Sequence, residues 1–490
     1  MSSLLKRSSV SKDSEKGADV DVARGEISPA TAASIEEENE FEVFKKTKDG
    51  VDFRTVGWPR AAVIFLKVIF ATGVLSIPTA MYSLGAVGGA LSVIGWGILN
   101  TYCAMIQGDF RNTHAGCHTV ADMAGIVGGA VIKELCGVLY LIAYVLCTGS
   151  GILGVCIGIN SLSHHAACSV WWSFLATCVV AVCASVRTFQ NVGWLTWAGF
   201  ISIFTAVFIV VVGVTTRDRP AAAPQTGPYD LGFHAIAYPT FTAGMVASST
   251  IFVSSAGTSA FMPVIAEMRK PQDYHKALFT CMGFVTVSYL TLSLVVYAWC
   301  GQWVASPSLG SAGQTIKMVS YGVGLIGLVV SACLYCHVAA KYLFVRILRN
   351  SVHLQKNSVI HWGTWLSCTF GLSAIAFILA EAIPIFNYLI ALTGSICFAP
   401  IAITLPGWLW LYDHWDYKSG SLAKKAAWGL HMFFVVLGLF ILVGGTYGVV
   451  EEIREAYANG EIGMYFLSVL PVRPPIISLS RGRLMIAFQD

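Results

Sequence analysis

The sequence has few charged residues. Charged side chains make up 12% of its 490 residues, against about 25% in an ordinary soluble domain. Hydrophobic residues make up 56%, and the mean hydropathy is +0.68. The net charge of +4 does not gather into a basic stripe, so nucleic acid is not an expected partner. This composition predicts an all-α polytopic membrane protein surrounded by a lipid bilayer.

Motifs for catalysis and metal binding are also missing. The chain has no Walker loop, His-Glu-x-x-His motif or nucleophile elbow. The pair His114 and His118, like the pair His164 and His165, falls in a short loop with no second ligand group nearby. We therefore expect no enzyme activity, no metal and no cofactor.

Long apolar segments fill most of the remaining sequence, and a helix needs about 20 such residues to cross the hydrocarbon core. Eleven segments are predicted to span, at 60–83, 85–107, 133–161, 169–187, 190–215, 240–267, 275–300, 316–348, 360–381, 383–411 and 428–450. The loops on the N-terminal side carry most of the Lys and Arg residues, which predicts a cytoplasmic N-terminus.

Three regions are expected along the chain. Residues 1–57 are polar and predict a disordered cytoplasmic tail. Residues 58–450 form the transmembrane domain. Because the number of spans is odd, residues 451–490 are expected to form an extracellular C-terminal tail.

The first apolar segment contains an interruption between Ala71 and Pro78. Gly73 loosens the backbone and Pro78 removes a hydrogen-bond donor, so together they favour a break in the helix. A break at membrane depth is tolerated where its free backbone groups line a cavity or meet a ligand. The alternative is a kink that serves only packing.

The sixth apolar segment repeats this pattern between Ile251 and Pro263, where Gly257 precedes the proline. The two breaks open halves of similar length, residues 60–215 and 240–411, followed by an extra helix at 428–450. Because each half has five spans, the halves enter the membrane in opposite orientations. This arrangement is typical of an inverted repeat with discontinuous helices at a transporter binding site.

The chemistry of the breaks favours a zwitterion. After the first break, near Ser76, the restarting helix presents free N–H groups that suit a carboxylate. In the sixth segment, the carbonyl groups near Val253 to Ser255 suit an ammonium group, and Thr258 adds a polar side chain. Neither break contains a charged residue, so the ligand side chain is expected to be neutral, with Phe252 and Phe261 as apolar walls.

The two interrupted segments resemble a known family. The run from Gly257 to Pro271, with the run from Gly73 to Pro78, is similar to the amino acid/auxin permease family of secondary transporters. The resemblance implies an APC/LeuT-like five-plus-five inverted repeat with an eleventh helix. It also implies uptake of neutral aliphatic and aromatic amino acids with protons across the fungal plasma membrane.

By carry-over from that family, two sets of residues would bind the substrate. The carboxylate would be held by Thr72, Gly73, Val74 and Leu75. The amino group and side chain would meet Phe252, Ser254, Ser255 and Gly257. Family members that use sodium bind it with groups of helices one and eight. The corresponding part of helix eight offers one hydroxyl, Ser331, so a proton is favoured over sodium.

Four ionisable or hydroxyl side chains are candidates for coupling or gating. Lys67 lies beside the first break, where it occupies a cation site or else snorkels to the surface. His337 carries a coupling proton or is an ordinary hydrogen-bonded core residue. Glu267 forms an inner gate or belongs to an interfacial charge cluster. Tyr144 faces the cavity or packs against Tyr140.

The function expected from these features is proton-coupled import of neutral amino acids by alternating access at the plasma membrane. A vacuolar amino acid transporter of the same family is the nearest alternative. A receptor that binds amino acids without transporting them, or a channel, is a further alternative from a different class.

Overall fold

The computed structural model describes residues 56–114, 116–186, 189–349, 351–354, 356, 358–459, 478–480 and 483–485. Most of the predicted N-terminal tail lies outside the described residues. Residues 460–477 of the predicted C-terminal tail also lie outside them. Near the C-terminus, the short strands β1 (Ser478–Ser480) and β2 (Arg483–Met485) pair antiparallel.

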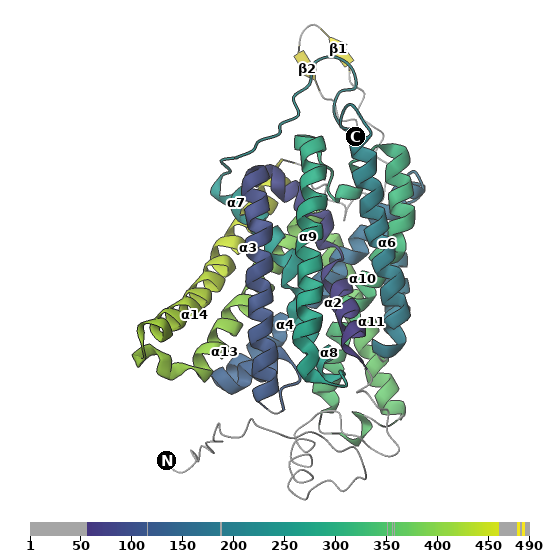
Figure 1. Ribbon diagram of the computed structural model, residues 1–490. Helices are drawn as coiled ribbons and strands as arrows, with labels where there is room; N and C mark the ends of the chain where they lie inside the picture. The colour runs from purple at the N-terminus through teal and green to yellow at the C-terminus, as the bar shows by residue number, and fades with distance from the viewer. Residues whose placement is uncertain are drawn as a thin grey trace, which may run out of the picture. The chain divides into compact units, whose positions relative to one another are not determined.

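The rest of the described chain is helical (Figure 1). The first half contains α2 (Trp58–Ile69), α3 (Ile77–Thr113), α4 (Val120–Leu162), α5 (Ser169–Ala184) and α6 (Phe189–Thr215). The second half contains α7 (Phe241–Ala256), α8 (Phe261–Ala266), α9 (Tyr274–Cys300), α10 (Gln314–Leu348) and α11 (Val359–Ala382). The remaining helices are α12 (Phe386–Leu392), α13 (Leu405–Asp413), α14 (Leu422–Phe440) and α15 (Thr446–Ala458).

The helices confirm an all-α membrane protein, but they do not confirm the count of eleven spans. Within the described residues, ten helical segments are long and apolar enough to cross a membrane. The predicted span 169–187 forms the 16-residue helix α5, which is shorter than each of these ten segments. Helix α4 begins at Val120, before the predicted third span at 133, and it is kinked at Gly129.

The predicted boundary between the first two spans falls at a sharp kink. At Gly85, φ is 76° and ψ is 166°, a conformation that side chains rarely adopt. Just beyond the kink, the N–H groups of Ala86 and Val87 donate to the carbonyls of His234 and Ala235, at 3.0 and 2.9 Å. The kink therefore fixes α3 against the loop that precedes α7.

The helices pack as two groups, each of which draws on both halves of the sequence. In one group, α3 packs against α7 and α9, and α2 packs against α9. In the other, α10 packs against α4, α5 and α11. Figure 1 shows α2 in front of α10. Helix α6 packs mainly against α10 and also contacts α2 and α9, so it connects the two groups.

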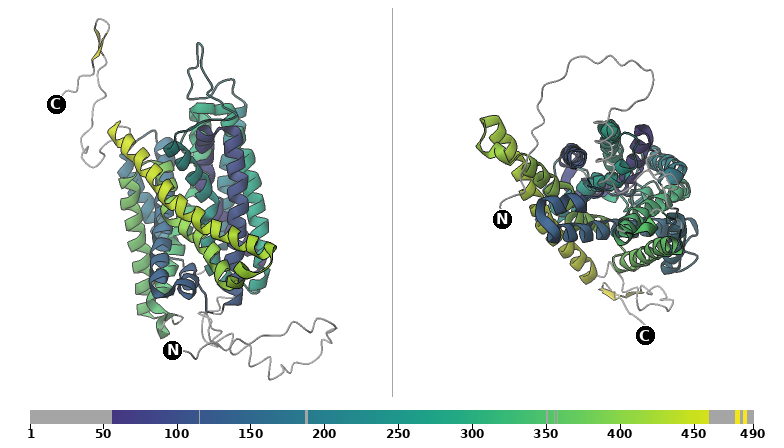
Figure 2. Two further views of the ribbon diagram at one scale, coloured as in Figure 1. Left: turned by 90° about the vertical axis from the view of Figure 1, so that its left-hand side faces the viewer. Right: turned by 90° about the horizontal axis from the view of Figure 1, so that it is seen from below.

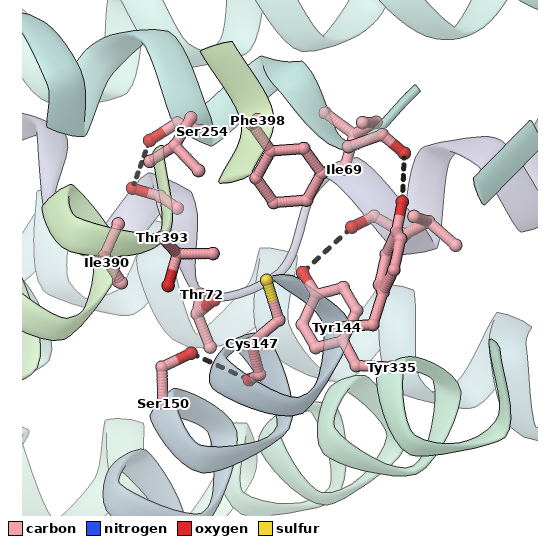
Figure 3. A pocket seen from close by; sticks show the side chains of 14 residues that line it. Ile69, Thr72, Tyr144, Cys147, Ser150, Ser254, Tyr335, Ile390, Thr393 and Phe398 are labelled. Atoms are coloured by element: carbon pink, nitrogen blue, oxygen red, sulfur yellow. Dashed lines mark hydrogen bonds between the residues drawn. The ribbon is translucent and has the colours of Figure 1, made fainter. Parts of the chain in front are cut away.

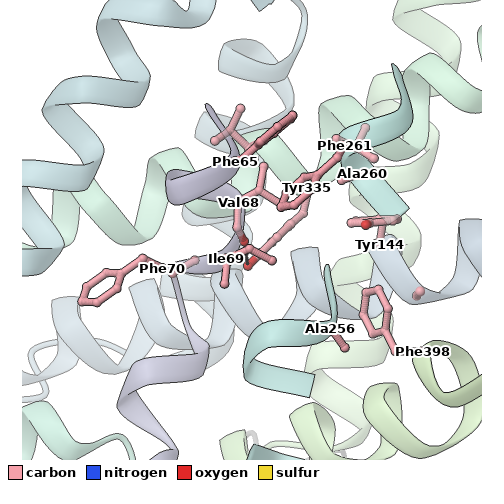
Figure 4. Packing of buried hydrophobic residues seen from close by; sticks show 14 of the residues in the cluster. Phe65, Val68, Ile69, Phe70, Tyr144, Ala256, Ala260, Phe261, Tyr335 and Phe398 are labelled. Carbon is pink, nitrogen blue, oxygen red and sulfur yellow. Dashed lines mark hydrogen bonds between the residues drawn. The ribbon is translucent and has the colours of Figure 1, made fainter. Parts of the chain in front are cut away.

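A continuous hydrophobic core lies where α2, α7 and α8 meet the second group (Figure 4). Phe65 and Phe261 are stacked there with ring centroids 4.0 Å apart. Tyr335 and Phe398 belong to the same buried cluster. The broken helices are therefore enclosed by protein rather than by lipid.

Helix α14 lies obliquely across the other helices, as the left view of Figure 2 shows. It packs against α13 and against the turn Trp415–Ser419 that joins the two. A π-helical turn, Ile441–Gly445, connects it to α15, and that turn packs against α7. The extra helix thus reaches the second broken helix.

We expect substitution of Gly85 by alanine to destabilise the fold. An added Cβ atom would lie 2.7 Å from the Ala237 nitrogen, in a conformation that costs a side chain about 1 to 3 kcal/mol. Gly95 is the matched control, because a Cβ atom there meets nothing within 4 Å. Thermal unfolding in detergent should show a lower melting temperature for Gly85→Ala than for Gly95→Ala. Equal melting temperatures would contradict this account of the kink.

Candidate functional site

The first predicted break is present and fully buried. Helix α2 ends at Ile69, a 3₁₀ turn covers Gly73–Leu75, and α3 begins at Ile77 with a proline in its first turn. Thr72 and Ser76 are 5% and 0% exposed. Within the described residues, no backbone carbonyl accepts a hydrogen bond from the N–H groups of residues 72 to 74. This break therefore offers donors.

The second predicted break is present as well. Helix α7 ends at Ala256, a 3₁₀ turn covers Gly257–Ala260, and α8 continues to Ala266. The hydroxyls of Ser254 and Ser255 are buried beside the last turn of α7. Both discontinuous helices expected from the Gly and Pro pattern are thus confirmed.

The two breaks touch each other. The Ser254 hydroxyl lies 3.3 Å from the Gly73 carbonyl and 2.7 Å from the Thr250 carbonyl in its own helix. A Cβ atom added to Gly73 would lie 2.8 Å from both Cα and Cβ of Ser254. Glycine is therefore required at this position because the backbone of α7 approaches so closely.

Tyrosine hydroxyls donate hydrogen bonds to several backbone carbonyl groups that have lost their helical partners at the breaks. The Tyr335 hydroxyl donates to the Val68 carbonyl at 3.0 Å. The Tyr289 hydroxyl lies 2.7 Å from the Ile69 carbonyl and 3.1 Å from the Ser254 carbonyl, so it bridges the two broken helices. Tyrosines from α9 and α10 thus hold the first break in place.

One more tyrosine hydroxyl and one side-chain amide form hydrogen bonds at the α7 break. The Tyr144 hydroxyl lies 3.1 Å from the Gly257 carbonyl and 2.8 Å from the Ser259 hydroxyl. The Asn100 side-chain amide donates to the Phe252 carbonyl at 3.2 Å and to the Ser255 hydroxyl at 2.8 Å. Among the carbonyls expected to face an ammonium group, near Val253 to Ser255, that of Ser254 accepts a hydrogen bond from Tyr289. The flanking carbonyls of Phe252 and Gly257 accept from Asn100 and Tyr144.

A small cavity of about 30 Å³ lies between the two breaks, which is room for one or two water molecules. Figure 3 shows its walls. The lining residues are Val68, Ile69, Thr72, Gly73, Tyr144, Cys147, Ser150, Val253, Ser254, Gly257, Tyr335, Ile390, Thr393 and Phe398. None of them carries a formal charge. The cavity must widen to admit a molecule as large as an amino acid.

The structure places five candidate residues in the cavity wall, namely Thr72, Gly73, Tyr144, Ser254 and Gly257. The other substrate-binding candidates are buried near the breaks but do not line it, namely Val74, Leu75, Ser76, Phe252, Ser255 and Thr258. The two phenylalanines expected as walls pack elsewhere, since Phe252 faces Trp96 at 5.1 Å and Phe261 stacks on Phe65.

The opposite wall comes from a part of the chain that the sequence did not identify. Ile390 lies on α12, while Thr393 and Phe398 belong to a π-helical turn, Thr393–Phe398. Wide helical turns of this type are frequent at functional sites. The sequence has no sharp signature for such a turn, whereas the polar Asn100 in an apolar span was a usable signal.

Lys67 is completely buried outside the cavity. Its ammonium nitrogen donates to the Gly327 carbonyl at 3.1 Å and to the Ser331 hydroxyl at 2.5 Å, both on α10. Within the described residues, no carboxylate lies within salt-bridge distance of it. This lysine therefore reaches across from the broken α2 to the neighbouring group of helices.

Glu267 forms a buried ion pair with Lys341, which joins the end of α8 to α10. Glu267 and Lys341 are 1% and 5% exposed. The segment before α2 closes the same end, because the Val56 N–H donates to the Glu267 carbonyl at 3.0 Å.

Burial, followed by the charge of Lys341, lowers the pKa of the loop residue His118 to about 3, so that imidazole is neutral.

His337 lies on the far side of α10 from the breaks. Its Nδ1 is 3.4 Å from the Ala184 carbonyl of α5, and its ring meets Trp365 of α11 edge-on at 5.3 Å. The side chain is buried among these helices and does not line the cavity. Its position fits the alternative of a hydrogen-bonded core histidine.

The chain is similar in sequence to known membrane transporters. The family described as "Transmembrane amino acid transporter protein" matches residues 54–451. A "Transmembrane transporter" of Gibberella moniliformis is 48% identical over 89% of this chain and 92% of its own length. The "N amino acid transport system protein" of Neurospora crassa is 27% identical over 84% of this chain and 87% of its own.

One solved structure that the chain matches is MhsT in complex with L-phenylalanine. It is 12% identical, covers 79% of this chain and 98% of its own, and gives a TM-score of 0.49.

We expect Lys341→Met to destabilise the protein strongly. The substitution leaves the Glu267 carboxylate buried without its cation, a change that costs about 3 to 5 kcal/mol. Adding Glu267→Gln should recover most of that loss, as thermal unfolding in detergent can measure. Arg454→Met, which breaks the exposed pair with Glu451, is the control and should cost about 1 kcal/mol or less. A double variant no more stable than Lys341→Met would contradict the pairing.

Proposed function

Because this chain belongs to the transmembrane amino acid transporter family, we propose that it imports neutral amino acids with protons by alternating access. Membership of this family makes the chain an amino acid transporter rather than an enzyme. The family predicted from the two interrupted segments is thereby confirmed. The neutral substrates, the proton and the transport cycle are the content of the proposal.

The observation that carries the proposal is the direct contact of the two breaks at Gly73 and Ser254. Within the described residues, the N–H groups of residues 72 to 74 have no backbone acceptor, and Thr72 and Gly73 line the cavity at this contact. Free donors at the start of a helix favour a carboxylate. The hydroxyls of Tyr144 and Ser150 on α4 line the same cavity and can accept from an ammonium group. The cavity therefore offers a zwitterion a partner for each of its charges.

The absence of formal charge among the lining residues supports a substrate with a neutral side chain. A charged side chain in this buried place would need a counter-ion that the wall does not supply. Ile390, Thr393 and Phe398 stand opposite the breaks, where the substrate side chain would lie. Aliphatic and aromatic side chains fit such a wall once the cavity has widened.

Alternating access would move one group of helices relative to the other. Helices α2, α7 and α8 carry the breaks, and Tyr289 of α9 in the same group bonds to both of them. From the other group, Tyr144 of α4 and Tyr335 of α10 bond to one break each. The buried pair of Glu267 and Lys341 joins these two groups at one end. Breaking this pair would open that end of the cavity, which in the proposed plasma-membrane orientation faces the cytoplasm.

Lys67 is the group that we assign to proton coupling. A charged ammonium group buried against neutral acceptors is costly, whereas a neutral amine is not. Opening of the α2 and α10 interface would let Lys67 take up a proton from one side and release it to the other. Sodium coupling is the competing mechanism.

The first test is uptake of labelled neutral amino acids into proteoliposomes that contain the full chain. Gly73→Leu should abolish uptake, because its side chain would occupy the contact with Ser254. Gly95→Leu is the control and should transport normally, because position 95 is exposed on α3. If the unchanged protein takes up no zwitterion, the proposed function is wrong; normal uptake by Gly73→Leu would remove this break from the site.

The second test compares an imposed pH gradient with an imposed sodium gradient. Accumulation should follow the pH gradient, and Lys67→Met should lose it while still exchanging labelled for unlabelled substrate. Lys276→Met removes an exposed lysine at the start of α9 and should behave like the unchanged protein. Accumulation that ignores pH, or a Lys67→Met variant that still responds to pH, would refute the coupling.

A further inference from the structure

A second cavity, of about 300 Å³, lies away from the two breaks. One face of α3, from Tyr102 to Thr113, forms one wall, and the last turn of α13, from Leu409 to His414, forms the other. Both helices end here, and their ends meet where His114 Nε2 lies 3.3 Å from the Asp413 carboxylate. The volume is within the range of small-molecule sites.

The walls of this cavity change from apolar to polar along the helices. Met105 and Ile106 line it deeper in the span, whereas Asp109 and Thr113 line it in the last turns of α3. From Ile106 to Thr113 the helix rises about 10 Å. Asp413 gives α13 a polar end at the same level. This gradient matches an amphiphile with its chain in the membrane and its head at the surface.

The polar rim favours a positively charged head. Asp109 and Asp413 both lie in the last turns of their helices, where the helix dipole is also negative. His275 Nε2 approaches the Asp109 carboxylate at 2.6 Å, His114 approaches Asp413, and His414 completes the rim. A neutral imidazole that donates a hydrogen bond to a carboxylate does not remove the negative charge of the carboxylate. The Asp109 side chain is 54% exposed and open to a ligand.

The kind of cation is limited by the aromatic side chains. Trp410 lines the cavity, but His414 stacks on its ring at 4.3 Å and His431 at 3.7 Å, both nearly parallel. A quaternary ammonium ion binds best to an uncovered ring face. Carboxylates and the Thr113 hydroxyl instead accept hydrogen bonds, which a primary ammonium group supplies. The rim therefore suits a primary amine.

A basic segment follows directly after the rim. Lys418 belongs to the turn Trp415–Ser419, and Lys424 and Lys425 lie in the first turn of α14. Amino groups of this kind bind phosphate oxygens. The ammonium groups of Lys418 and Lys424 lie over the rings of Trp415 and Tyr417, at 4.2 and 4.9 Å. These lysines follow Asp413 in the chain, so in the proposed site they are the candidate partners of a phosphate.

We propose that this cavity binds phosphatidylethanolamine. Its ammonium group lies at Asp109 and Asp413, one acyl chain follows Met105 and Ile106, and the phosphate faces the lysines of the α13 to α14 connection. In Figure 1, α13 and α14 lie beside the lower end of α3, at the edge of the bundle, where a lipid can enter sideways. The site is separate from the substrate cavity.

The test is native mass spectrometry of the purified full chain with phosphatidylethanolamine, phosphatidylcholine and phosphatidylglycerol at equal concentrations. It is done at pH 8, above the usual titration range of imidazole. Phosphatidylethanolamine should be retained about tenfold more than either other lipid, the ratio that corresponds to ~1.4 kcal/mol. Free ethanolamine should not displace it, because the acyl chain contributes to binding.

The double variant Asp109→Asn/Asp413→Asn should lower this preference to less than about twofold. Asp416→Asn removes an exposed carboxylate of the following turn and should keep the full preference. Thr113→Trp fills the rim without removing a charge or a buried side chain, so it should also lose the lipid. Melting temperatures identify any variant that has not folded.

Three results would overturn the proposal. They are equal retention of phosphatidylethanolamine and phosphatidylcholine by the unchanged protein, a preference for phosphatidylglycerol, and an unchanged preference in both folded cavity variants. None of these results bears on amino acid uptake, which is measured separately.

Discussion

The whole arrangement depends on one constraint, namely that a backbone group inside the hydrocarbon region needs a hydrogen-bond partner. Breaking two helices at membrane depth releases carbonyl and N–H groups that lipid cannot satisfy. The neighbouring helices supply hydroxyl and amide groups to the released carbonyls, and Tyr289 serves both breaks at once. Within the described residues, the N–H groups of residues 72 to 74 have no backbone acceptor, and the proposed function assigns them to the substrate carboxylate.

The same constraint explains why the breaks are enclosed. Helices α2 and α7 lie inside the bundle, where α9, α10 and α4 can reach them with tyrosine side chains. An exposed break would need water or lipid head groups instead. Other long apolar helices, such as α11 and α14, are continuous, so their backbone N–H and carbonyl groups form hydrogen bonds within the helix.

The sequence was sufficient for the features that depend on local backbone chemistry. Gly73 with Pro78, and Gly257 with Pro263, located both breaks and so the approximate site. Residues near the breaks were harder to place, because the direction of a side chain depends on which helices surround it. Phe252 therefore turned out to face Trp96, although it lies only two residues from the cavity-lining Ser254.

Contacts between distant segments could not be predicted in the same way. Nothing in the sequence pairs Glu267 with Lys341, which lies 74 residues away along the chain, yet the two form a buried ion pair. The acceptors of Lys67 lie 260 and 264 residues away along the chain. The wall formed by Ile390, Thr393 and Phe398 depends on a π-helical turn that no simple residue pattern specifies. A single sequence contains too little information on such pairings.

The short helix α5 has a consequence for the surrounding membrane. Its 16 residues rise about 24 Å, while the hydrocarbon core of a bilayer is about 30 Å thick. Trp171, Phe174 and Val182 are exposed on its outer surface, so lipid contacts this face directly. Hydrophobic mismatch of this size is relieved by local thinning of the bilayer. The protein is therefore expected to be surrounded by an uneven lipid annulus, thinnest beside α5.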